Sequence, residues 1–192
     1  MQTLVIGDWL QKLAAIEKPA FTIDNVLRFA RANGVKPDTL APYLNWSKGS
    51  YTRNLIFKSQ LFEVLAICWE KGQCSQAHNH RDQNCWMAVP IGKLRVQNFR
   101  VASRDAAHGR CTVVPTDSYD MDAEHPAAVA PDAPVHQVLN LAEFGQRAVS
   151  LHIYSHPYDS CEVYVPEKGT YCDVPLHYTS QYGKLSAEEK LA

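Results

Sequence analysis

Two histidines in a glycine-bounded segment offer the chemistry of a metal site. The pattern is Gly72-x5-His78-x-His80-x4-Cys85-x6-Gly92. Residues i and i+2 of a strand point to the same side, so His78 and His80 can hold one metal ion together. The flanking glycines mark the tight turns that such a strand needs. The spacing therefore predicts a metal-binding strand.

A third histidine follows on a later predicted strand, in the pattern Pro131-x-Ala133-x2-His136-x3-Asn140. Three neutral imidazoles leave a divalent ion with its full charge and, in an octahedral arrangement, with three adjacent open positions. Such a donor set suits a redox metal that binds an anionic substrate and dioxygen, and it suits a closed structural zinc poorly. A set in which Cys85 is a fourth ligand, for zinc or copper, is an alternative.

The segment 149–154 places three hydrogen-bonding side chains on one face of a predicted strand. Ser150, His152 and Tyr154 alternate with three apolar residues, so the two groups face opposite sides. Buried polar groups are costly unless they are hydrogen-bonded. The array indicates either a self-satisfied structural network or, in the interpretation we adopt, a relay that holds the Tyr154 phenol over the metal.

Helices are predicted in the first fifty residues. Apolar residues recur near helical spacing over 3–16. A second helix is predicted from Thr22 as N-cap to a stop at Gly34, and a short third one from Pro37 through Leu44. We expect these helices to pack on the outside of a larger domain.

Short strands are predicted from Arg53 onward. Gly, Pro, Asp and Asn punctuate the apolar runs, which is the rhythm of a sandwich or small barrel. The loosest stretch, 115–134, is predicted to be hairpin and loop. The predicted strands are Leu61–Trp69, Lys93–Val101, Cys111–Val114, Ala127–Ala130, Val135–Leu139, Ala148–Ser155, Cys161–Val165 and Val174–Tyr178.

Length and composition favour one folded domain. The chain has 192 residues, of which 46% are hydrophobic and 20% charged, which argues against disorder. We expect a single domain over 1–192, with an N-terminal helical part (1–50), a β-barrel (51–183) and a tail (184–192). The formal charge of −1 argues against nucleic acid as a partner.

Neither a membrane partner nor export is expected. The longest apolar run, 61–69, is far shorter than a bilayer span, and no secretory signal is recognisable at the N-terminus. The six cysteines include no CxxC pair and are predicted to be mostly reduced. We therefore expect a cytoplasmic protein, and a monomer.

The two histidine motifs together resemble the signature motifs of the cupin superfamily, whose members are small antiparallel barrels with a metal in the mouth. The first motif fits at every spacing, although Cys85 stands where most cupins have a ligating glutamate. In the second, Ala133 replaces a usual glycine, and the glycine expected near His125 is missing. The resemblance implies a mainly β fold: a small antiparallel cupin β-barrel of the jelly-roll type, with the N-terminal α-helices packed outside.

Several further runs occur in the same order and at similar separations in one cupin family. They are Tyr51-Thr52-Arg53-Asn54-Leu55, Ala66-Ile67-Cys68-Trp69, the first histidine motif, the segment 150–161 and the segment 174–183. In these runs the chain resembles the cysteine dioxygenase family. The resemblance implies that His78, His80 and His136 are the ligands of a non-haem Fe(II), the sole cofactor. It also implies that L-cysteine and dioxygen are converted to cysteine sulfinate.

The same resemblance implies roles for other side chains. Arg53 would clamp the substrate carboxylate, since a guanidinium offers a bidentate fork, and Tyr51 would add a hydroxyl to it. Tyr154 would direct its phenol at the substrate or oxygen, with His152 and Ser150 behind it. In animal members a cysteine at the position of Cys85 forms a thioether with this tyrosine. The sequence therefore predicts a Cys85–Tyr154 cross-link.

Four residues depart from the family pattern. Asn79 and Arg81 replace acidic and threonine residues beside the ligands, and Arg81 is expected to point outward because it follows His80 directly. Trp86 is bulkier than the usual aromatic residue, and His156 stands where the family tends to have proline. Pocket size and substrate choice stay open.

Other functions compete with cysteine oxidation. One is the same chemistry on 3-mercaptopropionate, although relatives that use this thiol tend to carry glutamine where Arg53 stands. Homocysteine is longer, and cysteamine lacks a carboxylate. A non-catalytic metal-binding cupin would share the three histidines without needing Arg53 or Tyr154. A zinc-dependent isomerase is disfavoured because the ligating glutamate is absent.

Overall fold

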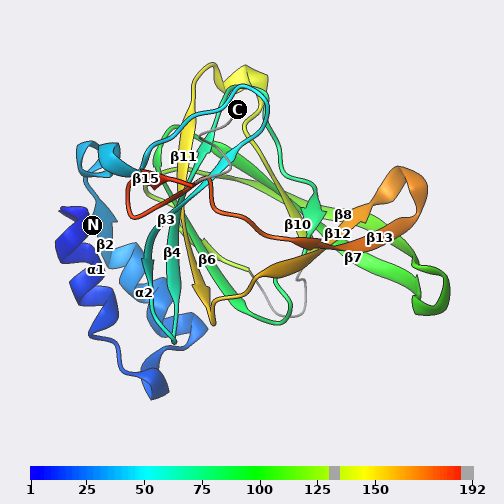
Figure 1. The fold of residues 1–192 in the computed structure, drawn as a ribbon, viewed down its shortest axis with the longest axis horizontal. Helices are drawn as coiled ribbons and strands as arrows, with labels where there is room; N and C mark the ends of the chain where they lie inside the picture. Colours follow the sequence, from blue (N-terminus) through cyan, green and yellow to red (C-terminus); the bar gives the residue numbers. More distant parts are fainter. Residues whose placement is uncertain (130–134, 187–192) are drawn as a thin grey trace.

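The computed structural model describes residues 1–129 and 135–186. A closed six-stranded barrel sheet packs against a seven-stranded sheet, and two α-helices cover the outside (Figure 1). The predicted mainly β jelly-roll barrel with external helices is confirmed. The strands are β1 (Gln2–Leu4), β2 (Asn33–Val35), β3 (Thr52–Lys58), β4 (Glu63–Trp69), β5 (Ala77–His78), β6 (Asn84–Ile91), β7 (Leu94–Asp105), β8 (Arg110–Met121), β9 (Ala127–Ala128), β10 (Val135–Leu139), β11 (Ala148–Ser155), β12 (Ser160–Val165), β13 (Thr170–Pro175), β14 (Ser180–Gln181) and β15 (Lys184–Leu185).

The helices follow the apolar periodicity. They are α1 (Ile6–Ala14), α2 (Ile23–Ala32) and the 3₁₀ segments Lys18–Ala20, Pro37–Tyr43, Ala106–His108, Ala142–Phe144 and Pro166–Lys168. Thr22 caps α2 as predicted, because its Oγ1 accepts a hydrogen bond from the Asn25 N–H. The predicted stop at Gly34 is wrong in detail: α2 ends at Ala32, and Gly34 lies in β2, which pairs in parallel with β1. For the same reason the first helix begins later than residue 3.

The two faces of β11 serve different parts of the core. Its apolar residues Val149, Leu151 and Ile153 pack in one cluster with Trp9 of α1 and Val26 of α2. In Figure 1 the helices lie on the left, against the sheet that contains β4, β11 and β6. The opposite face of β11, which carries Ser150, His152 and Tyr154, faces the six-stranded barrel sheet.

The stretch 115–134 was predicted to be hairpin and loop, and residues 115–121 are instead part of one long strand. They form the second half of β8, which pairs with β7 from Arg110 through Met121. This long hairpin projects on the right of Figure 1 beside β12 and β13. Its outer residues are largely exposed, so no apolar alternation marks the strand. The predicted strand 127–130 is shorter in the structure: β9 ends at Ala128, and Val129 is not in a strand. Ala130, Pro131 and Ala133 lie outside the described residues.

No helix within residues 1–129 and 135–186 combines the length and the apolar character needed to cross a bilayer.

The turn at Gly92 gives a stability prediction. Gly92 has a φ of 77°, and a Cβ there would lie 2.5 Å from the Arg147 carbonyl oxygen. We expect Gly92→Ala to lower the free energy of unfolding by about 2–4 kcal/mol, through left-handed strain and steric overlap. Gly72 has a φ of 86° and no atom near such a Cβ, so Gly72→Ala isolates the strain and should cost about 1–2 kcal/mol. Denaturant unfolding measures both, and equal losses would contradict the steric part.

Candidate metal centre and active site

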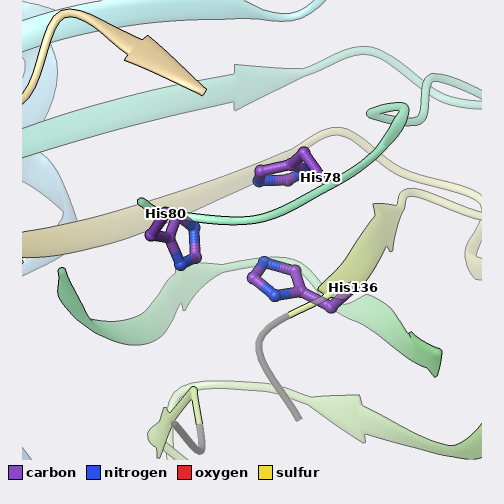
Figure 2. Close-up of side chains that lie close together, drawn as sticks. All are labelled: His78, His80 and His136. Atoms are coloured by element: carbon purple, nitrogen blue, oxygen red, sulfur yellow. The ribbon is translucent and has the colours of Figure 1, made fainter. Parts of the chain in front are cut away.

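Three histidine rings converge inside one end of the barrel. His78 closes β5 and pairs directly with His136 of β10, whereas His80 lies two residues beyond the strand. The ring centroids are 4.7 Å apart for His78 and His136, 4.8 Å for His80 and His136, and 5.3 Å for His78 and His80. Figure 2 shows the three rings around one small space. One ligand nitrogen from each ring lies within 4.8 Å of those of the other two. The predicted convergence is confirmed, although His80 lies past the strand end.

The donor atoms of these rings fit a metal ion. His78 Nδ1–H donates to the Gln76 carbonyl oxygen at 2.8 Å, which leaves Nε2 as the ligand atom. Both ring nitrogens of His80 and of His136 are buried and have no hydrogen-bond partner in the described part of the chain. Burial lowers the pKa of all three histidines, so the imidazoles are neutral. Buried nitrogens without partners are costly, and metal coordination would satisfy them.

A pocket of about 340 Å³ opens beside His78, and Tyr51 and Arg53 line it. Arg53 lies on β3, and its Nε and Nη2 are buried without a partner among residues 1–129 and 135–186. Its guanidinium carbon lies 5.9 Å from the centroid of the Tyr154 ring. A guanidinium is always charged and can only donate hydrogen bonds. The pocket therefore presents an anion-binding group next to the histidine cluster.

The C-terminal segment builds one wall of this pocket. Val174, Leu176 and Thr179 line it. The Thr179 N–H donates to the Arg53 carbonyl oxygen at 2.8 Å, and the Arg53 N–H donates to Thr179 Oγ1 at 3.2 Å. β14 then pairs in parallel with β3. The backbone of the arginine is thus fixed by a segment distant in sequence.

A linear hydrogen-bond chain runs along the inner face of β11. Trp69 Nε1–H donates to Ser150 Oγ at 2.9 Å. Ser150 Oγ lies 2.8 Å from His152 Nε2, and Tyr154 Oη lies 2.9 Å from His152 Nδ1. Because the indole nitrogen only donates, Ser150 accepts from Trp69, and its own hydroxyl hydrogen is available to His152 Nε2. The three residues lie on one buried face, as predicted.

The protonation states limit the directions that this hydrogen-bond chain can take. Burial lowers the pKa of His152 to about 3, so its ring is neutral. In the tautomer that accepts at Nε2, Nδ1 carries the hydrogen and donates it to Tyr154 Oη. Burial also raises the pKa of Tyr154, which stays a phenol. In that tautomer the Tyr154 hydroxyl hydrogen is free to point elsewhere.

Cys85 lies beside Tyr154. The two residues are direct partners across β6 and β11, and both are buried. Burial raises the pKa of the Cys85 thiol. Within the described residues, the potential metal-binding group contains the three histidines and no cysteine. The structure thus associates Cys85 with the phenol.

Two pocket residues were missed in the sequence. Tyr158 lines the pocket, and its ring centroid lies 5.2 Å from that of Tyr154 and 6.0 Å from that of His80. Tyr158 lies in the segment 150–161 that resembles the family, but no sequence motif indicated a role for it. His177 lines the pocket as well, and nothing in its spacing could have revealed this. Arg81 points outward as predicted, where it forms an ion pair with Asp173.

Comparison with known proteins shows the family to which the chain belongs. The family model for cysteine dioxygenase type I matches residues 7–167. The chain belongs to the cysteine dioxygenase family. It is 24% identical to cysteine dioxygenase type 1 of Danio rerio over 191 residues, which cover 98% of this chain and 93% of that protein. It is 25% identical to cysteine dioxygenase type 1 of Homo sapiens over 162 residues, which cover 84% and 78% of the two chains.

One solved structure that is similar to this chain is a protein with a double-stranded β-helix domain from Klebsiella pneumoniae. The similarity has a TM-score of 0.45 and 14% sequence identity, and it covers 71% of this chain and 95% of that one. Family membership and the histidine cluster together make this family member a thiol dioxygenase of the cupin superfamily, with a metal site formed by three histidines.

Proposed function

We propose that this protein oxidises L-cysteine with dioxygen to cysteine sulfinate at an Fe(II) centre. The observation that carries the proposal is Arg53, whose buried Nε and Nη2 lack partners in the described chain and which lines the pocket beside His78. A guanidinium fork matches a carboxylate in shape and charge. L-cysteine carries a carboxylate at one end and metal-binding thiol and amine groups at the other.

Iron suits the donor set better than a structural metal does. His78, His80 and His136 would hold it through neutral imidazoles and leave other positions open. When bound, ferrous iron would supply the redox chemistry that joins dioxygen to sulfur. The remaining tasks, which are to bind the thiol, orient it and hold protons, belong to the chain's own residues.

Arg53 and Tyr51 orient the substrate in this proposal. Tyr51 stacks on Trp69, with ring centroids 4.6 Å apart, so its hydroxyl is held at the pocket wall. Arg53 takes the carboxylate, and Tyr51 adds a second hydrogen bond to it. Two fixed donors keep the thiol end at the histidine cluster, which lowers the entropic cost of reaching the reactive geometry.

Tyr154 supplies a hydrogen-bond donor over the reacting atoms. Its oxygen accepts from His152, so its own hydrogen is directed to the substrate or to oxygen. Ser150 keeps the His152 ring in the required tautomer. The relay holds a proton at Tyr154 Oη, next to where negative charge develops.

The Tyr154→Phe variant should mainly lower kcat. Loss of one hydrogen bond to a charged group is worth about 1.5–3 kcal/mol, so we expect kcat to fall about 10–100-fold, with KM changed by less than about threefold. Steady-state oxygen uptake measures both values. An unchanged kcat would contradict a direct role for the phenol.

Cys85 and Tyr154 should form a thioether in part of the purified protein. A C–S bond replaces the S–H and one ring C–H bond, and dioxygen accepts the two electrons and two protons. Mass analysis of tryptic peptides after turnover with iron and cysteine should show the two peptides joined, short by two hydrogens. Cys85→Ser is the control and should abolish the species. Separate peptides alone in the wild type would rule the cross-link out.

An oxygen-uptake assay over a panel of thiols tests the proposed function. The Fe(II)-loaded protein should show its highest kcat/KM with L-cysteine, ahead of 3-mercaptopropionate, homocysteine and cysteamine, and should form cysteine sulfinate. A preference for 3-mercaptopropionate of about tenfold, or about 1.4 kcal/mol in the transition state, would assign that substrate instead. Tightly held zinc with no uptake after iron loading would favour a non-catalytic cupin.

A further inference from the structure

The segment that carries two of the three histidines has little regular strand to hold it. β5 consists of Ala77 and His78 alone, and His80 lies beyond it. Directly afterwards, Arg81 and Asp82 have positive φ values of 52° and 62°, which is unusual for residues with side chains. Ladder pairing therefore cannot by itself fix the His80 ring relative to the His78 ring.

Asn79, the residue between the two histidines, is bonded to Glu162 of β12 by three hydrogen bonds. The Asn79 N–H donates to the Glu162 carbonyl oxygen at 3.1 Å. The Glu162 N–H donates to Asn79 Oδ1 at 3.2 Å, and Asn79 Nδ2 donates to Glu162 Oε2 at 2.8 Å. Asn79 Oδ1 also accepts from the Arg81 N–H at 3.3 Å. One side chain thus connects the ligand segment, the strained turn and β12.

Glu162 is held rigidly in turn. Arg104 of β7 binds its carboxylate with two nitrogens, at 2.5 Å to Oε1 and 3.0 Å to Oε2. The Tyr164 hydroxyl donates to Oε2 at 2.8 Å. The Arg104 guanidinium stacks over the Tyr171 ring at 4.1 Å. The Glu162 residue is 9% exposed, whereas the Arg104 side chain is 41% exposed.

None of Asn79, Glu162, Tyr164 and Arg104 lines the pocket beside His78. The four side chains cannot touch a substrate there. We propose that Glu162 and Asn79 are positioning residues, which set the angle between the His78 and His80 rings through the backbone of residue 79. The inference rests on the metal role of the three histidines in the proposed function, and not on which thiol is oxidised.

The test uses Co(II), whose visible absorption reports ligand geometry without turnover. The variants are Glu162→Gln, which removes the charge that binds Arg104, and Asn79→Ala, which leaves the Arg104–Glu162 pair intact. Both should weaken Co(II) binding about 10–100-fold, as is usual when groups that orient ligands are lost, and both should shift the visible bands. Binding is measured by competition with a chelator of known affinity.

Asp120→Asn is the matched control. Asp120 also accepts from an arginine, Arg95, at 2.7 Å, and its side-chain partners in the part of the chain that the structure describes are Arg95 and Lys93. Unfolding of the metal-free proteins calibrates the general loss of stability in each variant. The control should lose stability while its Co(II) affinity stays within about twofold.

Three results would overturn the inference. One is wild-type Co(II) affinity and spectra in Asn79→Ala, even if Glu162→Gln is unstable. Another is an equal loss of affinity in the Asp120→Asn control. A wild-type protein that binds no Co(II) would remove the metal centre, and the proposed function with it, whereas a changed thiol preference would affect the proposed function alone.

Discussion

We expect the His136→Ala variant to retain less than about a tenth of a metal ion per chain and to take up no oxygen with any thiol. Loss of a group that merely orients a ligand already costs about 10–100-fold in metal affinity, so loss of a ligand costs more. His136 is the one ligand from β10, while His78 and His80 come from a single segment. Without it, the two imidazoles of the 78–80 segment would have to hold the ion alone. Metal analysis of the purified variant measures the effect.

The control for this experiment is His125→Ala. His125 is exposed and pairs with Asp122 at 2.7 Å, away from the cluster, so metal content and oxygen uptake should be unchanged. A second measurement separates metal loss from misfolding. A bound metal stabilises the native state, so adding Co(II) should raise the Tm of the wild type and of His125→Ala but not that of His136→Ala. A His136→Ala protein with full metal content would contradict the three-histidine site.

The Arg53→Gln variant should raise KM for L-cysteine about 10–100-fold while kcat changes by less than about threefold. A hydrogen bond to a charged group is worth about 1.5–3 kcal/mol, and each 1.4 kcal/mol is about tenfold in affinity. Glutamine keeps some of the volume but loses the charge and the fork. Oxygen uptake over a range of cysteine concentrations measures both constants.

Two comparisons sharpen this result. Arg53→Lys retains the charge without the planar fork, so its KM should lie between those of the wild type and Arg53→Gln. Cysteamine has no carboxylate, so any turnover of it should be nearly equal in the wild type and Arg53→Gln. If KM for L-cysteine is unchanged in Arg53→Gln, the carboxylate is held by another group.

Local patterns predicted the elements that carry the site. The predicted strands Val135–Leu139 and Ala148–Ser155 coincide with β10 and β11, because alternation separates apolar from polar side chains there. β6 was not predicted, since it lies between β11 and β9 and shows no clear alternation. The second half of β8, residues 115–121, is strand only because β7 pairs with it. Its mostly exposed residues leave no periodic signal.

The candidate site divides in the same way. The histidines and the β11 array could be predicted because each of these residues stands in a short motif. The contact of Asn79 with Glu162 joins residues 83 positions apart, and neither residue belongs to a spacing pattern. Tyr158 and His177 line the pocket because tertiary folding brings their segments there. A residue that joins the site only through tertiary contacts, and that belongs to no local sequence pattern, cannot be predicted from a single sequence.

The backbone bonds between Arg53 and Thr179 have a consequence for biosynthesis. During translation the ribosome synthesises β3 early, whereas the C-terminal segment that lines the pocket beside Arg53 is synthesised near the end. We therefore expect the proposed thiol-binding pocket to be complete only after synthesis has passed Thr179. A transcript truncated upstream of that codon would yield much of the barrel with an Arg53 that lacks its backbone partner, and we expect such a product to be inactive.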